Sequence, residues 1–238
     1  MPLVNANTGG SADKLSRFDF DATADTYDQW YETAEGAMYD RLEKKVVSRY
    51  LRQNTQGRKL LEVGCGTGHW SQFFSDCGFA VTGVDISERM IKIAQSKNIT
   101  NASFQIADGH SLPFKGNSFD VTAAITTLEF AGNAELVLKE MARCTRKPSG
   151  QLLIGVLSAL APLNRNRQKN PESLYAKARL FTPGQIKKLL SKYGKTKVCT
   201  VGFILGQKRL LPLSPFIDVV GRFLHLPYGV FIAGKVIL

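Results

Sequence analysis

The sequence lacks a long uninterrupted apolar run. Its longest apolar region, residues 210–238, is broken by Pro212, Pro215 and Pro227 and by charged residues. A helix that crosses a bilayer needs about 20 consecutive apolar residues, so we expect no transmembrane segment. The first ten residues carry neither the basic start nor the apolar stretch of a signal peptide. We therefore expect a cytoplasmic protein, with a peripheral position at a membrane surface left open.

Cysteine and histidine are also scarce. The four cysteines, Cys65, Cys77, Cys144 and Cys199, are scattered, and no C-x-x-C pair or histidine-rich segment accompanies them. A disulfide framework or a structural zinc site requires closer, patterned spacing. The sequence therefore predicts reduced, buried thiols and no metal site.

Acidic residues are almost missing from one part of the chain. Residues 139–209 carry 16 basic side chains and only two acidic ones, whereas residues 1–138 carry 13 basic and 17 acidic ones. A basic field attracts nucleic acid, anionic lipid, an acidic carrier protein or an anionic small molecule. An ordinary solvated face fits the same pattern, so the charge alone does not choose among these partners.

The order of predicted elements is that of an α/β domain. A chain of 238 residues that is 44% hydrophobic is long enough for one such domain. Apolar runs and helical spacing alternate along it. This alternation predicts a parallel sheet with helices on both faces. The predicted strands are residues 59–63, 80–84, 102–106, 119–126, 151–157, 197–204 and 228–238, and the helices are residues 36–53, 69–77, 87–96, 133–146 and 184–193.

A glycine-rich turn follows the first predicted strand. Gly64, Gly66 and Gly68 form a G-x-G-x-G pattern, preceded by Glu62. Glycines there allow the backbone to turn tightly and to approach a ligand closely. The dinucleotide fingerprint is G-x-G-x-x-G, so the early third glycine disfavours an NAD-linked oxidoreductase.

Carboxylates follow the next two predicted strands. Asp85 ends the second strand, where an acid accepts hydrogen bonds from both hydroxyls of a ribose. Asp108 lies just past the third strand, where it can receive an exocyclic amino group; a turn-forming role before Gly109 is the alternative. The fourth strand leads to Ile125 and Thr126, and then to Glu129.

In order and spacing, these four segments resemble the class I S-adenosylmethionine (SAM)-dependent methyltransferases, of the type 11 methyltransferase domain family, from about residue 20 to about 157. The resemblance implies a single Rossmann-like, doubly wound domain whose seven-stranded sheet has a reversed last strand. It further implies a helical cap (17–53), a SAM-binding core (54–157) and a substrate-side region with the final strands (158–238). Residues 1–16 are polar and rich in Gly, Ser and Asn, so we expect a frayed N-terminus there.

The resemblance also implies which residues hold SAM, whose product is S-adenosylhomocysteine. The glycine loop wraps the methionine part, Asp85 binds the ribose and Asp108 faces the adenine. The N-terminal segment that contains Tyr27 caps the cofactor. The rings of Tyr27 and Tyr31 can cover the sulfonium by a cation–π contact, and a place in the ordinary aromatic core is the alternative for both. The full expected set is Tyr27, Glu62, Gly64, Cys65, Gly66, Gly68, Asp85, Ile86, Met90, Asp108, Gly109, Ile125 and Thr126.

Catalysis requires little beyond placing the acceptor in line with the methyl group and excluding water. If the acceptor must lose a proton, Glu129, His69 and His110 are the candidate bases. The expected acceptor is a small molecule that is apolar, anionic, lipid-like or carrier-bound. An RNA or protein methyltransferase that uses residues 139–209, and a non-catalytic module that binds SAM, a membrane or a partner, remain alternatives.

Overall fold

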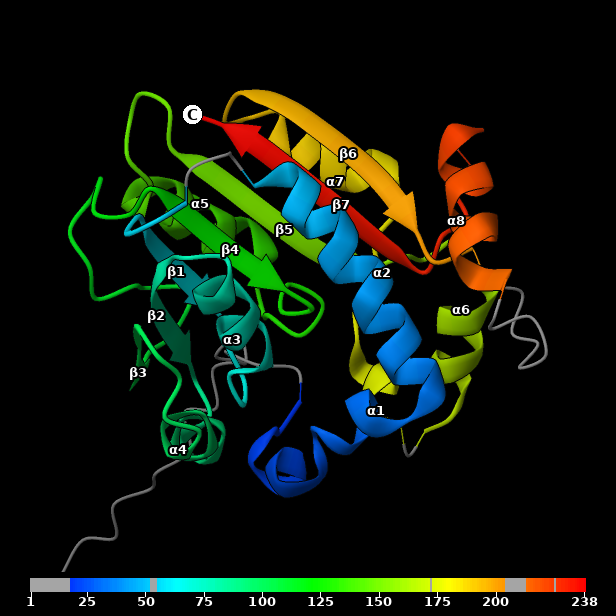
Figure 1. The fold of residues 1–238 in the computed structure, drawn as a ribbon, viewed down its shortest axis with the longest axis horizontal. Coiled ribbons are helices and arrows are strands. Elements are labelled where there is room, and N and C mark those ends of the chain that lie inside the picture. Colours follow the sequence, from blue (N-terminus) through cyan, green and yellow to red (C-terminus); the bar gives the residue numbers. More distant parts are fainter. Residues whose placement is uncertain (1–17, 52–54, 172, 204–212, 225) are drawn as a thin grey trace, which may run out of the picture.

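Seven strands form one mixed sheet in the order β3-β2-β1-β4-β5-β7-β6 (Figure 1). The computed structural model describes residues 18–51, 55–171, 173–203, 213–224 and 226–238. Strands β1 to β5 are parallel, and β7 runs antiparallel between β5 and β6. The reversed last strand is confirmed. The strands are β1 Lys59–Val63, β2 Ala80–Asp85, β3 Ala102–Ile106, β4 Val121–Ile125, β5 Gln151–Leu157, β6 Lys195–Val201 and β7 Phe231–Ile237.

Helices cover both faces of the sheet, as expected for a doubly wound domain. On one face, Val137 and Met141 of α5 and Ile186 of α7 enter a core with β-strand residues. On the other, Val47 of α2 and Phe74 of α3 pack against the same sheet. The helical elements are η1 Asp21–Thr26, α1 Gln29–Glu32, α2 Ala34–Tyr50, α3 His69–Asp76, α4 Glu88–Ser96, α5 Ala134–Cys144, α6 Pro162–Lys169, η2 Leu174–Lys177, α7 Pro183–Leu190 and α8 Ser214–Phe223.

The fourth strand is shorter than the sequence predicts. Its apolar run covers residues 119–126, but β4 spans only Val121–Ile125. Phe119 makes an isolated bridge to Thr145, and Thr126 has a φ of 49°. A positive φ at a non-glycine residue ends the strand at this point, and it turns the chain toward the strand-end loops.

The late part of the chain contains more helix than the sequence predicts. Helix α6 lies in a stretch without a clear helical period, and α8 lies in the apolar region before the last strand, where the sequence predicts no helix. Among the helices that the structure describes, none is long and apolar enough to span a membrane. The expectations for residues 1–16 and for Ile204 fall outside the described residues.

The start of α7 permits a paired stability test. Thr182 caps this helix through its side chain, which accepts a hydrogen bond from the Gln185 N–H, while the Gln185 side chain accepts one from the Thr182 N–H. Thr182→Ala should lower the free energy of unfolding by about 1 kcal/mol. Gly184 has open space around its Cα, so Gly184→Ala should raise it by up to about 1 kcal/mol. Urea unfolding measures both, and equal effects of the same sign would contradict the capping account.

Candidate active site

The glycine loop is fixed against the end of β4. Gly64, Gly66 and Gly68 all have positive φ, at 71°, 52° and 84°. A Cβ on Gly64 would lie 2.2 Å from Cγ2 of Thr127. The Thr127 hydroxyl lies 3.1 Å from the carbonyl oxygen of Val63, within hydrogen-bonding distance. Position 64 therefore requires glycine for both its backbone angle and its space.

Asp85 stands at the end of β2, beside the loop. One carboxylate oxygen accepts the Gly66 N–H at 2.9 Å, and the other accepts the Ser87 N–H at 2.9 Å. Burial raises the pKa of Asp85, and the backbone N–H groups of Ser87, Gly66 and Ile86 act in the opposite direction. Each oxygen keeps a second lone pair for a ligand hydroxyl.

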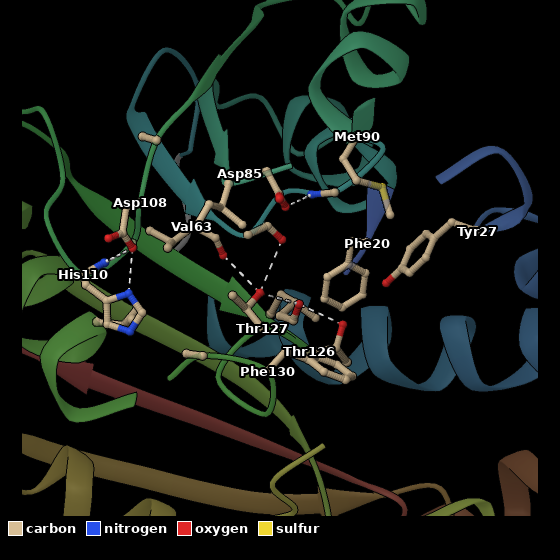
Figure 2. A pocket seen from close by; sticks show the side chains of 18 residues that line it. Phe20, Tyr27, Val63, Asp85, Met90, Asp108, His110, Thr126, Thr127 and Phe130 are labelled. Atoms are coloured by element: carbon tan, nitrogen blue, oxygen red, sulfur yellow. Dashed lines mark hydrogen bonds and ion pairs between the residues drawn. The ribbon is translucent and has the colours of Figure 1, made fainter. Parts of the chain in front are cut away.

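A first cavity with about 700 Å³ of empty space opens over these strand ends. Figure 2 shows Asp85 on its wall, with Met90 and Tyr27 to one side and Asp108 to the other. Of the residues expected at the cofactor, ten line it: Tyr27, Gly64, Gly66, Asp85, Ile86, Met90, Asp108, Gly109, Ile125 and Thr126. His110 also lines it, and Phe20, Thr127 and Phe130 are among the further lining residues.

Side-chain hydrogen bonds fix the N-terminal segment at two places beside the first cavity. Thr67 of the glycine loop donates a hydrogen bond to Asp28 at 2.6 Å. Ser87, at the start of α4, donates one to Asp21. These bonds hold η1 and α1 against the rim of the first cavity, and with them Tyr27 between Asp21 and Asp28.

His110 is engaged at both ring nitrogens. The backbone N–H of Asn133 donates to Nε2 at 3.1 Å, so Nε2 is unprotonated. The proton is therefore on Nδ1, which donates to Asp108 at 2.6 Å. This arrangement makes His110 a support for Asp108. It leaves no ring nitrogen for the role of a base that the sequence suggested.

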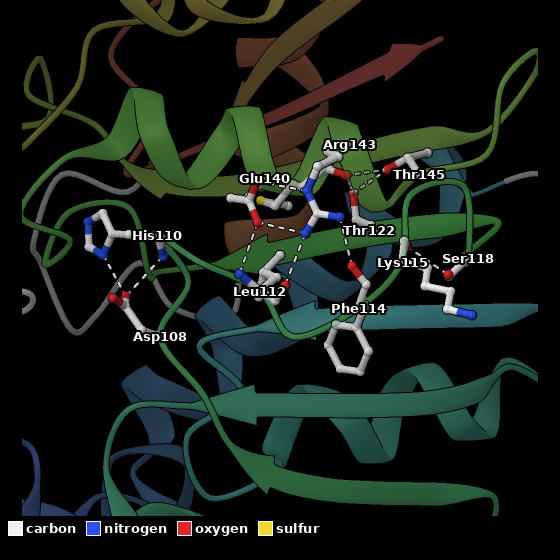
Figure 3. A network of polar contacts seen from close by, with 11 residues as sticks. Asp108, His110, Leu112, Phe114, Lys115, Ser118, Thr122, Glu140, Arg143 and Thr145 are labelled. Carbon is white, nitrogen blue, oxygen red and sulfur yellow. Dashed lines mark hydrogen bonds and ion pairs between the residues drawn. The ribbon is translucent and has the colours of Figure 1, made fainter.

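The loop that carries Asp108 and His110 is anchored on α5 (Figure 3). Glu140 accepts the Leu112 N–H at 2.9 Å. Arg143 pairs with Glu140 and donates to the carbonyl oxygens of Leu112 and Phe114. Asp108 is thus held by its own loop and by a helix on the far side of it.

Three residues expected at the cofactor lie outside the lining of the first cavity. Glu62 is buried and accepts a hydrogen bond from Ser71 of α3. Burial raises the pKa of Glu62 to about 8. Cys65 and Gly68 are buried as well. These residues shape the loop from within instead of facing a ligand.

His69 and Glu129, the other candidate bases, also lie outside the lining of the first cavity. The ring of His69 stacks on Tyr31 with centroids 3.6 Å apart, and its Nε2 lies 2.7 Å from Asp40. Glu129 is fully buried and accepts the Leu157 N–H through Oε1. Within the described part of the chain, its Oε2 has no partner. Burial raises the pKa of Glu129 to about 8, which keeps a proton on this acid at neutral pH.

A second cavity, which sequence reasoning missed, adjoins the first. It holds about 1140 Å³ of empty space and shares Tyr27, Thr126 and Phe130 with the first cavity. Aromatic rings make up much of its wall. Its remaining lining residues are Phe18, Thr23, Thr26, Trp30, Tyr31, Tyr39, Asp40, Glu43, Leu157, Arg167, Leu174, Tyr175 and Val230.

The second cavity contains two polar groups of interest. The Arg167 guanidinium lies 4.6 Å from the Trp30 ring centroid and pairs with Glu35 at 3.2 Å. Glu43 receives no hydrogen bond from any described residue. Burial, and then the charge of Asp40, raise the pKa of Glu43 to about 8, while Arg167 opposes this shift. The sequence gives little indication of the second cavity. Among the residues that line it, the aromatic-rich segment 17–33 is the part with a recognisable pattern.

Comparisons with known proteins agree with this geometry. A family model described as a methyltransferase domain matches residues 61–154. A demethylmenaquinone methyltransferase of Thermotoga maritima is 30% identical over 172 residues, which cover 71% of this chain and 72% of that protein. A malonyl-[acyl-carrier protein] O-methyltransferase of Erwinia billingiae is 34% identical over 128 residues, which cover 54% of this chain and 50% of that protein. The match thus spans half the length of the Erwinia relative.

A solved structure shows the same fold. It is a SAM-dependent methyltransferase of Thermotoga maritima, titled a possible histamine N-methyltransferase. It superposes with a TM-score of 0.70 at 24% identity and covers 91% of this chain and 96% of its own. The chain is therefore an enzyme with the class I methyltransferase fold. It belongs to the SAM-dependent methyltransferases, and its cofactor is SAM.

Gly64→Ala should remove cofactor binding by driving a methyl group into Thr127. We expect the affinity for S-adenosylhomocysteine, measured by calorimetry, to fall at least about 10-fold. Gly57→Ala is the matched control, because Gly57 has a φ of 69° and nothing within 4 Å of its Cβ position. It should lose about 1 kcal/mol of stability and keep its affinity. Equal affinities in the two variants would contradict the steric account.

Glu129 should make stability depend on pH. Its folded pKa of about 8 exceeds the ordinary 4.5, so its contribution is complete below about pH 4.5 and is lost as the pH rises through 8. The free energy of unfolding in urea should therefore fall from pH 5 to pH 9. Gln resembles the protonated acid. The free energy of unfolding of Glu129→Gln should therefore fall less steeply with pH than that of the wild type, by up to about 1 kcal/mol per pH unit.

The control for this test is Glu88→Gln, because Glu88 is an exposed glutamate on α4. It should keep the wild-type slope. Parallel curves for wild type and Glu129→Gln would show that Glu129 is already ionised in the folded protein.

Proposed function

We propose that this enzyme methylates a small molecule held in the second cavity. The observation that carries the proposal is the shared wall of the two cavities. Tyr27, Thr126 and Phe130 border both, so a ligand in the second cavity lies next to one in the first. Such adjacency is what an in-line transfer between two bound molecules requires.

The residues of the first cavity fit SAM. Asp85 offers two lone pairs to the ribose hydroxyls, and Asp108, fixed by His110, offers its carboxylate to the adenine. Gly64 and Gly66 line the first cavity where the methionine part would lie, and Gly64 lets its backbone pass close to Thr127, where a Cβ would collide with that side chain. Tyr27 places a ring at the boundary between the cavities, where the sulfonium would be covered. The cofactor supplies an activated methyl group, and these residues orient it.

The wall of the second cavity favours an acceptor with an apolar or aromatic body and a polar head. Trp30, Tyr39 and Tyr175 offer flat surfaces for stacking. Arg167 offers N–H donors to an anionic group, such as a carboxylate. The relatives' names, which refer to demethylmenaquinone and to malonyl-acyl carrier protein, include an aromatic quinone and a carboxylated acyl group. We propose an acceptor of this amphipathic kind.

Glu43 is the group in the second cavity that is best suited to take a proton from the acceptor. It lines the cavity and has no hydrogen-bond donor among the described residues. The charged groups that act on Glu43 are Asp40 and Lys44 on the same helix, Arg167 on α6 and Glu129 after β4. A carboxyl whose pKa is about 8 is matched to proton transfer near neutral pH.

The test uses SAM with a labelled methyl group and cell extract divided into small molecules, RNA and protein. We expect label in the small-molecule fraction. With the acceptor identified, kcat should rise with pH toward about 8, because Glu43 must be ionised. Glu43→Gln should lose this dependence and about 100-fold in kcat, with unchanged affinity for S-adenosylhomocysteine.

Glu32→Gln, at an exposed position of α1, is the matched control and should keep the wild-type pH profile. Label found only in RNA, or on protein side chains and not on an acyl group bound to a carrier protein, would overturn the small-molecule proposal. A Glu43→Gln variant with a wild-type profile would reject the base and leave the acceptor site standing.

A further inference from the structure

Helix α8 presents its apolar side to the outside of the molecule. It lies at one edge of the fold, after the last residues of β6 (Figure 1). The exposed fractions of Phe216 and Phe223 are 71% and 80%. Large exposed side chains recur at intervals of three and four residues, which places them on one face. This apolar face consists of Leu213, Phe216, Val219, Val220, Phe223 and Leu224.

Asp218 and Arg222 lie on the opposite side of α8 from the apolar face, toward the protein interior. Asp218 is only 2% exposed, accepts the Gly202 N–H at 2.8 Å and accepts the Arg222 Nε–H at 2.8 Å. A helix on a water-facing surface has the opposite arrangement, with its apolar stripe toward the core. Because the buried Asp218 fixes the rotation of α8, the apolar face cannot turn inward.

The neighbouring surface is basic. Helix α2 packs beside α8 and carries exposed Arg41, Lys45 and Arg49 at intervals of four residues. None of the three has an acidic partner in the described part of the chain. Gly202, whose N–H donates to Asp218 of α8, packs against Tyr39 of α2, so α8 lies beside this part of α2.

The positive charge of the second half of the chain indicates what kind of partner binds the apolar face. From residue 139 to the end, the chain carries 18 basic and three acidic side chains. A second copy would bring the same positive charge against it, and like charges repel. An anionic lipid bilayer offers apolar chains to α8 and negative headgroups to α2.

We propose that the enzyme binds an anionic membrane surface through α8, with Phe216 and Phe223 among the acyl chains and Arg41, Lys45 and Arg49 at the headgroups. The interaction is peripheral, since α8 has ten residues and lies in the plane of the interface. This inference goes beyond the proposed reaction, because it concerns where the enzyme works and does not depend on the acceptor.

The test is flotation of the 238-residue chain with vesicles of phosphatidylcholine alone or with 30% phosphatidylglycerol. We expect binding to the anionic vesicles and at least 10-fold weaker binding to the neutral ones. The double variant Phe216→Ser/Phe223→Ser should bind anionic vesicles at least 10-fold more weakly. Ile106→Ser, at a 53% exposed position on β3, is the matched control and should bind like the wild type.

The basic residues are tested separately. Arg41→Gln/Lys45→Gln should lose about 10-fold on anionic vesicles and nothing on neutral ones. All variants should retain wild-type affinity for S-adenosylhomocysteine, which shows that they are folded. Wild-type protein that does not float with anionic vesicles, or a phenylalanine double variant that floats equally well, would overturn the proposal. So would a dimer, detected by light scattering, that the double variant abolishes, because a second copy would then cover α8.

Discussion

The close approach of the Gly64 backbone to Thr127 is the constraint on which the site depends. The Thr127 hydroxyl lies within 3.3 Å of three carbonyl oxygens, from Val63, Gly64 and Ile125. It therefore fastens the end of β1 to the end of β4. The first cavity borders this junction, and the adjacent Thr126 lines both cavities. The turn at Thr126, with its positive φ, brings Thr127 into this position. This part of the wall of the first cavity is thus a product of two strand ends, not of the glycine loop alone.

The sequence predicts the first cavity well, because residues at the ends of parallel strands share one edge of the sheet. That rule alone places Asp85 and Asp108 together. It does not say where a side chain points. Glu129 also follows a strand, yet its carboxyl turns inward to the Leu157 N–H. His110 lies at the cavity, but a contact with Asn133, 23 residues away, decides its tautomer.

The sequence does not predict the second cavity, because the residues of its wall come from distant, irregular parts of the chain. Glu43 belongs to the middle of α2, and Arg167 and Tyr175 come from a stretch without a clear period. Nothing in their local sequence distinguishes them from solvated charges or ordinary aromatic residues. Only packing brings the Arg167 guanidinium between the rings of Trp30 and Tyr175, 4.6 and 5.3 Å from their centroids.

The proposed membrane-binding helix α8 and the proposed acceptor site in the second cavity are close to each other in the fold. Asp218 of α8 holds the Gly202 N–H, and Gly202, with a φ of 80°, packs its Cα side against Tyr39 and Val230. Tyr39 and Val230 both line the second cavity. The helix with the exposed apolar face is therefore one residue layer from the aromatic wall of the acceptor site. An amphipathic acceptor that partitions into a bilayer would be concentrated on the side of the enzyme where its cavity lies, so the two proposals are consistent with the same class of molecule.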